Sequence, residues 1–100
     1  MRLTGFQKKS IVDVIVKQFG SDVEIYLFGS RADDSKKGGD IDLLVDLRRD
    51  SGNIEKNKIK AITGIQFAIG DQKIDLIVTP DINKDQRLVV REALKTGVRL

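Results

Sequence analysis

The twenty residues from position 26 to position 45 (YLFGSRADDSKKGGDIDLLV) constrain the fold more than any other stretch. They predict an apolar strand, a tight turn at Gly29 and Ser30, a polar loop, and a second strand that opens with two aspartates. Side chains alternate between the faces of a strand, so Asp40 and Asp42 are expected on one face, with their apolar neighbours in a core. Two adjacent carboxylates repel each other, and a divalent cation is the usual means of offsetting that repulsion.

Composition excludes several kinds of site. The chain has no cysteine and no histidine, which rules out disulfides, thiolate or imidazole metal sites, and catalysis that depends on a histidine. A metal ion would need oxygen ligands, which favours magnesium, manganese or calcium. Apolar residues make up 40% and charged residues 33%, with no apolar run of membrane-span length and no secretory signal. We therefore expect one soluble domain over residues 1–100, located in the cytoplasm, whose net charge of +3 is too small to identify a partner.

The remaining segments predict a small domain of the α/β (α+β) class. A capping box at Thr4 and Gln7 precedes apolar residues at helical spacing, which predicts a helix over about 5–19. Five segments follow: a strand over 23–28, a short helical turn at 29–32, a loop at 33–39, a second strand over about 41–47 and a loop at 48–53. The order is completed by a helix over 54–69, a strand over 74–78 that ends before Pro80, and a last helix over about 84–95.

Two of the helices carry apolar faces that we expect to be buried. The face of the helix over 54–69 consists of four isoleucines, at positions 59, 62, 65 and 69. Gly64 in the same helix predicts either a kink or close packing. In the last helix we expect burial of Leu88, of Val89 or Val90, and of Leu94, and an end at Gly97.

A third carboxylate extends the pair at 40 and 42. Asp75 is the only acidic residue within the apolar strand KIDLIV. If this strand pairs with the strand over 41–47 and their core faces match, Asp75 lies on the same face as Asp40 and Asp42. Three carboxylates there can hold two magnesium ions roughly 3.5–4 Å apart. The Gly29 turn offers backbone N–H groups to phosphate, and Arg31, with Lys36 or Lys37 as further candidates, would neutralise phosphate charge.

The same residues also have structural interpretations. Gly29 and Ser30 can form an ordinary turn, and the aspartates at 40 and 42 can be the solvated end of a strand. Asp75 can instead pair with a lysine such as Lys73 or Lys58. The three segments occurring together, in this order, favour the interpretation as a functional site.

The motif Gly29-Ser30-Arg31-Ala32, with Asp40-Ile41-Asp42 beginning eleven residues after Gly29 and Asp75 in a later strand, resembles the DNA polymerase β-type nucleotidyltransferase superfamily. Within it, the chain is similar to the minimal nucleotidyltransferases of bacteria and archaea. The resemblance implies a small mixed β-sheet flanked by helices, as in the palm of polymerase β. It also implies transfer of a nucleoside monophosphate, chiefly AMP from ATP, to a hydroxyl group.

The resemblance assigns roles to these residues. Asp40 and Asp42 would bind two magnesium ions, for which manganese can substitute, and Asp75 would complete one metal site and accept the proton of the hydroxyl. Gly29 and Ser30 would hold the β- and γ-phosphates of ATP or another nucleoside triphosphate, with Arg31 beside them.

The resemblance also bears on partners. Many minimal members are encoded beside a small helical HEPN-family protein and act as its antitoxin, some by adenylylating a tyrosine of that toxin. The sequence ends at Leu100 without a further domain to hold an acceptor, so we expect such a partner to position it, with self-association of this chain left open. No membrane contact and no direct nucleic-acid contact are expected.

One departure from the family pattern leaves a second function open. Asp33 and Asp34 stand where related members commonly have arginine and glycine, so a basic group is missing and two negative charges are added. The alternative is a non-catalytic antitoxin or scaffold subunit that neutralises a helical partner by binding it.

Overall fold

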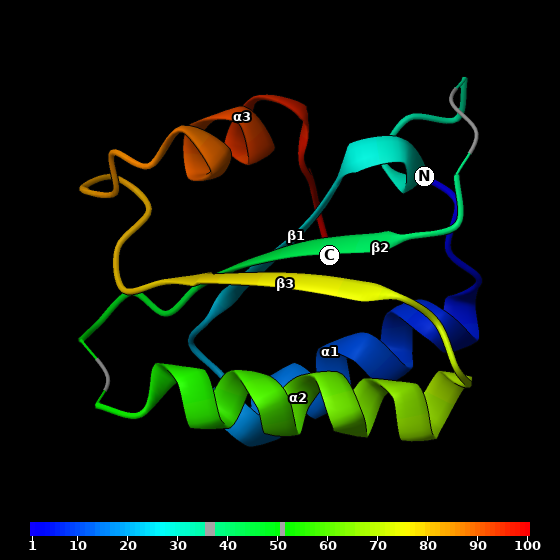
Figure 1. The fold of residues 1–100 in the computed structure, drawn as a ribbon, viewed down its shortest axis with the longest axis horizontal. Helices are drawn as coiled ribbons and strands as arrows, with labels where there is room; N and C mark the ends of the chain where they lie inside the picture. The colour runs from blue at the N-terminus through cyan, green and yellow to red at the C-terminus, as the bar shows by residue number, and fades with distance from the viewer. Residues whose placement is uncertain (36–37, 51) are drawn as a thin grey trace.

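The computed structural model describes residues 1–35, 38–50 and 52–100, and its elements follow the predicted order with one added strand (Figure 1). In chain order they are α1 (Gly5–Phe19), β1 (Glu24–Phe28), the 3₁₀ helix η1 (Gly29–Arg31), β2 (Ile41–Asp46), α2 (Ile54–Ile69), β3 (Ile74–Thr79), α3 (Leu88–Thr96) and β4 (Val98–Arg99). Lys36 and Lys37, two candidates for neutralising phosphate charge, lie outside the described residues.

The strands form one mixed sheet in the order β3-β2-β1-β4. β1 runs antiparallel to both β2 and β4, whereas β2 and β3 are parallel. A parallel pair needs a crossover connection, and α2 supplies it. Helices α1 and α2 cover one face of the sheet and α3 covers the other, which gives three layers (Figure 1). The prediction of a small mixed sheet flanked by helices is confirmed.

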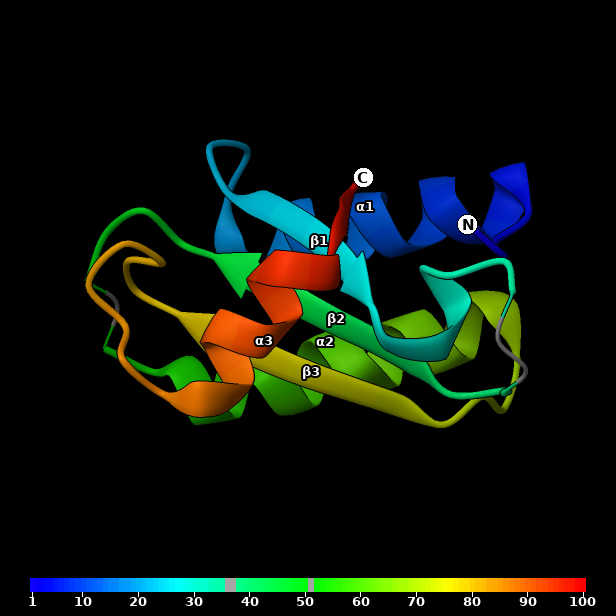
Figure 2. The ribbon, with the colours of Figure 1, turned by 90° about the horizontal axis from the view of Figure 1, so that it is seen from above.

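The two faces of the sheet are covered to different extents. On the α1/α2 face, alternate strand residues such as Leu27 and Leu43 are fully buried against Ile11 and Ile65 in the main core. The α3 face carries a smaller cluster, formed by Leu44, Ile82, Val90 and Ala93. Seen from above, α3 lies over only part of this face, and η1 stands at the end where β2 and β3 begin (Figure 2). Polar side chains at the starts of β2 and β3 can therefore reach solvent on the α3 face.

Local sequence signals set the first two helices. The capping box at α1 is present: Thr4 Oγ1 accepts a hydrogen bond from the N–H of Gln7, and Gln7 Oε1 accepts one from the N–H of Thr4, both at 3.0 Å. Gly64 of α2 provides close packing, because a Cβ at this position would lie 3.0 Å from Cγ1 of Val14 on α1. The predicted bounds of both helices are confirmed.

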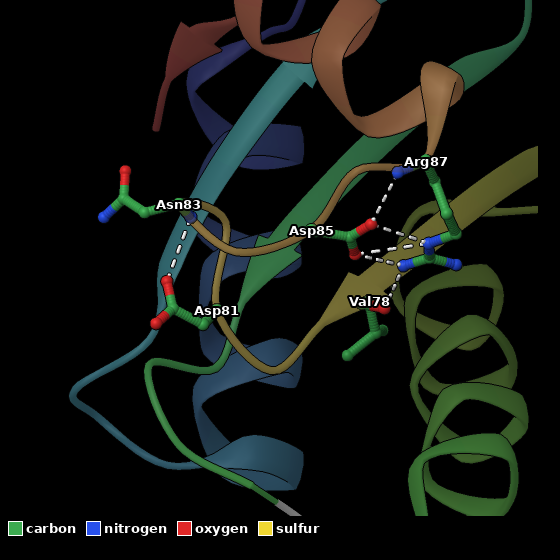
Figure 3. Close-up of polar contacts among 5 residues, drawn as sticks. All are labelled: Val78, Asp81, Asn83, Asp85 and Arg87. Atoms are coloured by element: carbon green, nitrogen blue, oxygen red, sulfur yellow. Dashed lines mark hydrogen bonds and ion pairs between the residues drawn. The ribbon is translucent and has the colours of Figure 1, made fainter.

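The predicted start of the last helix is wrong, because α3 begins only at Leu88. Two aspartates in the preceding segment bind backbone N–H groups through their side chains (Figure 3). Asp81 Oδ1 accepts from the N–H of Asn83 at 2.9 Å, and Asp85 Oδ1 accepts from the N–H of Arg87 at 3.0 Å. Such bonds offer the backbone an alternative to the helix, and they hold the chain in turn and extended conformations up to Arg87.

The buried residues of the later helices also differ from the prediction. In α3 Val90 is buried, as predicted for one of the two valines, and Ala93 is buried with it, whereas Leu88 is 75% exposed and Leu94 is 43% exposed. In α2, Ile65 is buried as predicted, but Ile59 is 65% exposed because it lies outside the strip that meets α1 and the sheet.

Strand β4 was not predicted. Its two residues pair antiparallel with β1, with Val98 opposite Leu27 and Arg99 opposite Tyr26. Gly97 ends α3, as predicted, and a Cβ on it would lie 2.7 Å from the carbonyl oxygen of Ala93. A two-residue strand is too short to show an alternating pattern, so its pairing depends on the chain returning to β1.

None of the helices in the described part of the chain combines the length and the hydropathy of a membrane span.

Candidate functional site

Two of the three predicted carboxylates meet on the α3 face of the sheet. Asp42 is the second residue of β2 and Asp75 is the second residue of β3, and the parallel register places them directly opposite each other. Phe28, the last residue of β1, lies opposite Asp42 on the other side. The expectation that Asp75 would share a face with Asp42 is therefore confirmed, because the apolar residues of both strands face the same core.

The pair carries an excess of negative charge. Burial raises the pKa of Asp42 from 3.8 to about 6, and a hydrogen bond with Asp75 and the negative charges of Asp75 and Asp40 add to the increase. The positive charge of Lys73 opposes it only weakly. A cation close to these oxygens would favour the ionised form of Asp42 and remove the repulsion.

Asp40 stands apart from this pair. Its Oδ2 lies 3.6 Å from Nζ of Lys73, and its side chain is half exposed. Within the residues that the structure describes, no three acidic side chains are grouped closely enough to form a metal site. The same described part of the chain shows no ion pair between Asp75 and either Lys73 or Lys58, the alternative considered for Asp75, and Lys73 pairs with Asp40 instead.

Gly29 brings the turn after β1 against Asp42. Its φ of +73° lies in the left-handed region, and a Cβ on it would fall 2.2 Å from Oδ2 of Asp42. Only glycine fits both the conformation and the contact, which agrees with the expected close approach at this turn. The next residue, Ser30, places its hydroxyl where a Cβ on Gly38 would lie only 2.5 Å away.

The guanidinium of Arg31 holds the loop together through hydrogen bonds from all three of its nitrogens. Its Nε and Nη2 donate to the carbonyl of Gly39 at 3.2 and 3.1 Å, and its Nη1 donates to the carbonyl of Arg2 at 3.0 Å. A further contact at 3.4 Å reaches Oε1 of Gln72, in the turn before β3. Arg31 thus connects three segments that surround the site, and its role towards phosphate stays a prediction.

Arg2 is a site residue that sequence reasoning missed. Its N–H donates to the carbonyl of Arg31 at 2.7 Å, and its Nη2 donates to the carbonyls of Gly38 at 2.9 Å and Ser30 at 3.3 Å. Its Nε is buried and has no hydrogen-bond partner among the described residues. No local motif marks a single arginine near the amino terminus, so only the folded structure reveals that it supports the Gly-Ser turn.

Asp34, one of the two residues that depart from the family pattern, forms an ion pair with the amino group of Met1. Part of the negative charge that it adds to the loop is therefore neutralised within the chain. The side chain of Asp33 accepts hydrogen bonds from the N–H and the hydroxyl of Ser35, at 2.9 and 2.6 Å.

The residues present fit a divalent cation. Asp42 and Asp75 offer carboxylate oxygens in register, the kind of ligand that magnesium and manganese prefer, and the pKa of Asp42 is raised as expected for a crowded acidic site. Asp40 is adjacent, and its ion pair with Lys73 is exposed, so it contributes little free energy and is easily opened. The glycine at 29 leaves the Asp42 oxygens accessible to a ligand bound at the turn.

Comparison with known proteins agrees with this geometry. A family model described as a nucleotidyltransferase domain matches residues 9–100, which includes every strand and the turn after β1. A search of curated proteins found no match to this chain. The family match covers most of the sequence, and the mixed sheet, the Gly-Ser turn and the paired aspartates are consistent with it. The chain therefore belongs to the nucleotidyltransferase domain family.

Proposed function

We propose that this nucleotidyltransferase transfers AMP from ATP to a hydroxyl group in a reaction that depends on magnesium. The observation that carries the proposal is the register of Asp42 opposite Asp75, beside a turn that only glycine at position 29 allows. Carboxylates that face each other at the starts of two strands destabilise the fold when no cation is bound. Their presence is explained if the site binds metal ions together with a nucleotide.

Asp40, Asp42 and Asp75 are the residues that would hold two magnesium ions. When bound, these ions supply positive charge to the α-phosphoryl group and to the departing pyrophosphate. Gly29 and Ser30 offer backbone N–H groups and a hydroxyl to the β- and γ-phosphates.

The acceptor oxygen forms a bond to the α-phosphorus while the bond from that phosphorus to the β-bridging oxygen breaks. Pyrophosphate leaves, and the proton of the hydroxyl passes to the carboxylate of Asp75, which acts as general base.

The acceptor in this proposal is a tyrosine hydroxyl on a small helical protein of the HEPN type. The chain would then act as the antitoxin of a toxin–antitoxin pair, inactivating its partner by adenylylation. This part rests on the resemblance of the Gly29–Ala32 and Asp40–Asp42 motifs to the minimal nucleotidyltransferases.

Labelled ATP tests the reaction. The protein is incubated with magnesium, with the proteins that co-purify with it from its host, and with ATP labelled at either the α- or the γ-phosphate. We expect label to be transferred from α-labelled ATP only. Asp42→Asn should abolish transfer, whereas Asp71→Asn, at an exposed turn position, should leave it unchanged. Efficient transfer by the double variant Asp40→Asn/Asp42→Asn would show that these carboxylates do not form the catalytic site.

Two contacts favour the alternative of a non-catalytic binding subunit. Asp40 is paired with Lys73, and all three guanidinium nitrogens of Arg31 already donate a hydrogen bond to a protein oxygen. If the Asp40→Asn/Asp42→Asn variant neutralises the partner as well as the wild type does, the protein acts by binding. If neutralisation is lost together with transfer, it acts as an enzyme.

A further inference from the structure

Strand β3 forms one end of the sheet, and half of its backbone groups point away from it. At its two ends, the carbonyls of Lys73 and Thr79 accept hydrogen bonds from the β2 segment at 3.0 and 2.9 Å. Backbone groups alternate in direction along a strand, so the N–H and C=O groups of Ile74, Leu76 and Val78 face outwards. An outward row of this kind is a template for another strand.

Side chains already occupy both ends of this outward row. At one end, Nη2 of Arg87 donates to the carbonyl of Val78 at 3.1 Å, and a two-pronged ion pair with Asp85 fixes the guanidinium (Figure 3). At the other end, Nε2 of Gln66 donates to the carbonyl of Gln72 at 3.0 Å.

No side-chain hydrogen bond to the backbone of Ile74 or Leu76 occurs among the described residues. The free part of the edge is therefore the two residues that flank Asp75.

A groove runs along this free part of the edge. It encloses about 410 Å³ and lies between α2, which contributes Lys58 and Ile62, and α3, which contributes Val89. Its base includes β3 itself, and the carboxylates of Asp42 and Asp75 open into it. Figure 1 shows β3 between these two helices, with no strand on its outer side. We call this hollow the edge groove.

We infer that the edge groove binds an extended polypeptide segment as a fifth strand beside β3, and that this segment presents the acceptor hydroxyl to Asp75. The backbone groups of Ile74 and Leu76 would supply its main-chain hydrogen bonds. A residue opposite Asp75 on an added antiparallel strand has its Cβ about 4.5–5.5 Å from that of Asp75, on the same face of the sheet. A hydroxyl there is within reach of the carboxylate. The second half of the inference rests on the proposed function, and the first half does not.

The structure disfavours β3 of a second copy of this chain as the occupant. A two-fold antiparallel pairing of β3 centred on Asp75 places two Asp75 carboxylates directly opposite each other, which is destabilising. A pairing centred on Leu76 needs the carbonyl of Val78, which Arg87 occupies, and one centred on Ile74 needs the carbonyl of Gln72, which Gln66 occupies. A different polypeptide can use the two free residues without either penalty.

Hydrogen exchange with a defined probe tests the binding. The probe is a pool of acetylated seven-residue peptides with a central tyrosine, serine or threonine and varied apolar residues on either side. With a binding member present, we expect the amide protons of Ile74 and Leu76 to exchange at least tenfold more slowly, as measured by NMR on the full chain. The same peptide with proline beside its centre should give no protection, because proline removes a backbone donor.

A pair of variants on α3 provides the control. Val89→Glu places a charge in the wall of the edge groove, whereas Leu94→Glu makes a similar change at a comparably exposed position on the same helix, beside Ile82. We expect Val89→Glu to weaken peptide binding at least tenfold and Leu94→Glu to leave it unchanged. Equal effects of the two variants would contradict the inference.

The remaining outcomes separate this inference from the proposed function. If no peptide in the pool protects Ile74 and Leu76, or if their protection rises with protein concentration alone, the edge groove does not bind a foreign strand and the inference is wrong. AMP transfer observed under those conditions would leave the proposed function intact. Protection of both amides without AMP transfer would support the binding site and count against the reaction.

Discussion

At the scale of single residues, the ionised side chain of Asp42 lowers the free energy of unfolding, and this effect should depend on pH. The pKa of Asp42 is about 6 in the folded protein and 3.8 when unperturbed, so its ionisation destabilises the fold as pH rises between these values. Above pH 6 the full cost is present, and below pH 3.8 both states are protonated and it vanishes. Because this side chain is partly exposed, solvent screening reduces the cost to about 1 kcal/mol.

We therefore predict that Asp42→Asn is more stable than the wild type by about 1 kcal/mol at pH 8 without divalent metal, and equally stable at pH 3.5. Urea unfolding at the two pH values measures the difference. Asp71→Asn, an exposed control, should show no such dependence. A constant offset at both pH values would mean that the effect of the substitution is not electrostatic.

A comparison with Gly70 separates the cost of backbone strain at Gly29 from the cost of its contact with Asp42. Gly70 has a similar positive φ of +99°, but a Cβ there would meet nothing within 4 Å. Because its ψ is −178°, Gly70 lies in a region open essentially only to glycine, so Gly70→Ala should cost about 1–3 kcal/mol through strain alone. Gly29→Ala adds a clash with the Asp42 carboxylate and should cost at least about 1 kcal/mol more, with loss of nucleotide binding. Thermal unfolding and ATP titration of both variants test this, and equal costs would show that the close approach is unimportant.

At the scale of elements, the segment between β3 and α3 protects the edge of the sheet. The hydrogen bonds from Arg87 hold the pKa of Asp85 well below its usual range, and the buried hydroxyl of Thr79 contributes to this although it makes no hydrogen bond of ordinary geometry. The ion pair between Asp85 and Arg87 keeps the guanidinium hydrogen-bonded to the carbonyl of Val78. Natural proteins often cover or charge an exposed strand edge in this way, because it prevents pairing between copies.

Arg87→Ala should free the carbonyl of Val78 and allow β3 to pair with a second copy. We predict that the variant self-associates at concentrations where the wild type does not, as measured by sedimentation velocity. Arg91→Ala provides the matched control, since Arg91 is an exposed arginine of α3 whose side chain makes no hydrogen bond or ion pair with β3 among the described residues. An Arg87→Ala protein with wild-type sedimentation would indicate that other features protect the edge.

At the scale of the whole molecule, metal and nucleotide should stabilise the fold together. A ligand that binds only the native state raises the free energy of unfolding, by about 2.7 kcal/mol at a concentration one hundred times its Kd. Magnesium with ATP should therefore raise the melting temperature of the wild type by several degrees, and that of Asp42→Asn by much less. Differential scanning calorimetry of both proteins, with and without each ligand, makes the comparison. A wild-type melting temperature that is indifferent to magnesium and ATP would argue against a metal site.

The sequence by itself determined the parts of the fold that depend on residues close together in the chain. The capping box at Thr4 sets the start of α1, the 3.6-residue spacing of apolar side chains predicts both α1 and α2, and the glycines at positions 20 and 70 set their ends. Alternation of apolar and polar residues places Asp42 and Asp75 on one face of the sheet, since a one-residue slip of either strand would bury the carboxylate of that strand in the main core. The turn at Gly29 follows from the conformational freedom of glycine.

Only the tertiary structure decided the contacts between distant segments. The ion pair of Asp40 with Lys73 and the support of Ser30 and Gly38 by Arg2 both depend on side chains brought together by folding. A lysine or arginine can reach many partners along its flexible stem, and no local pattern selects among them. A pattern of apolar residues is compatible with few structures because an entire face must be buried, whereas the choice of a polar partner changes the free energy little.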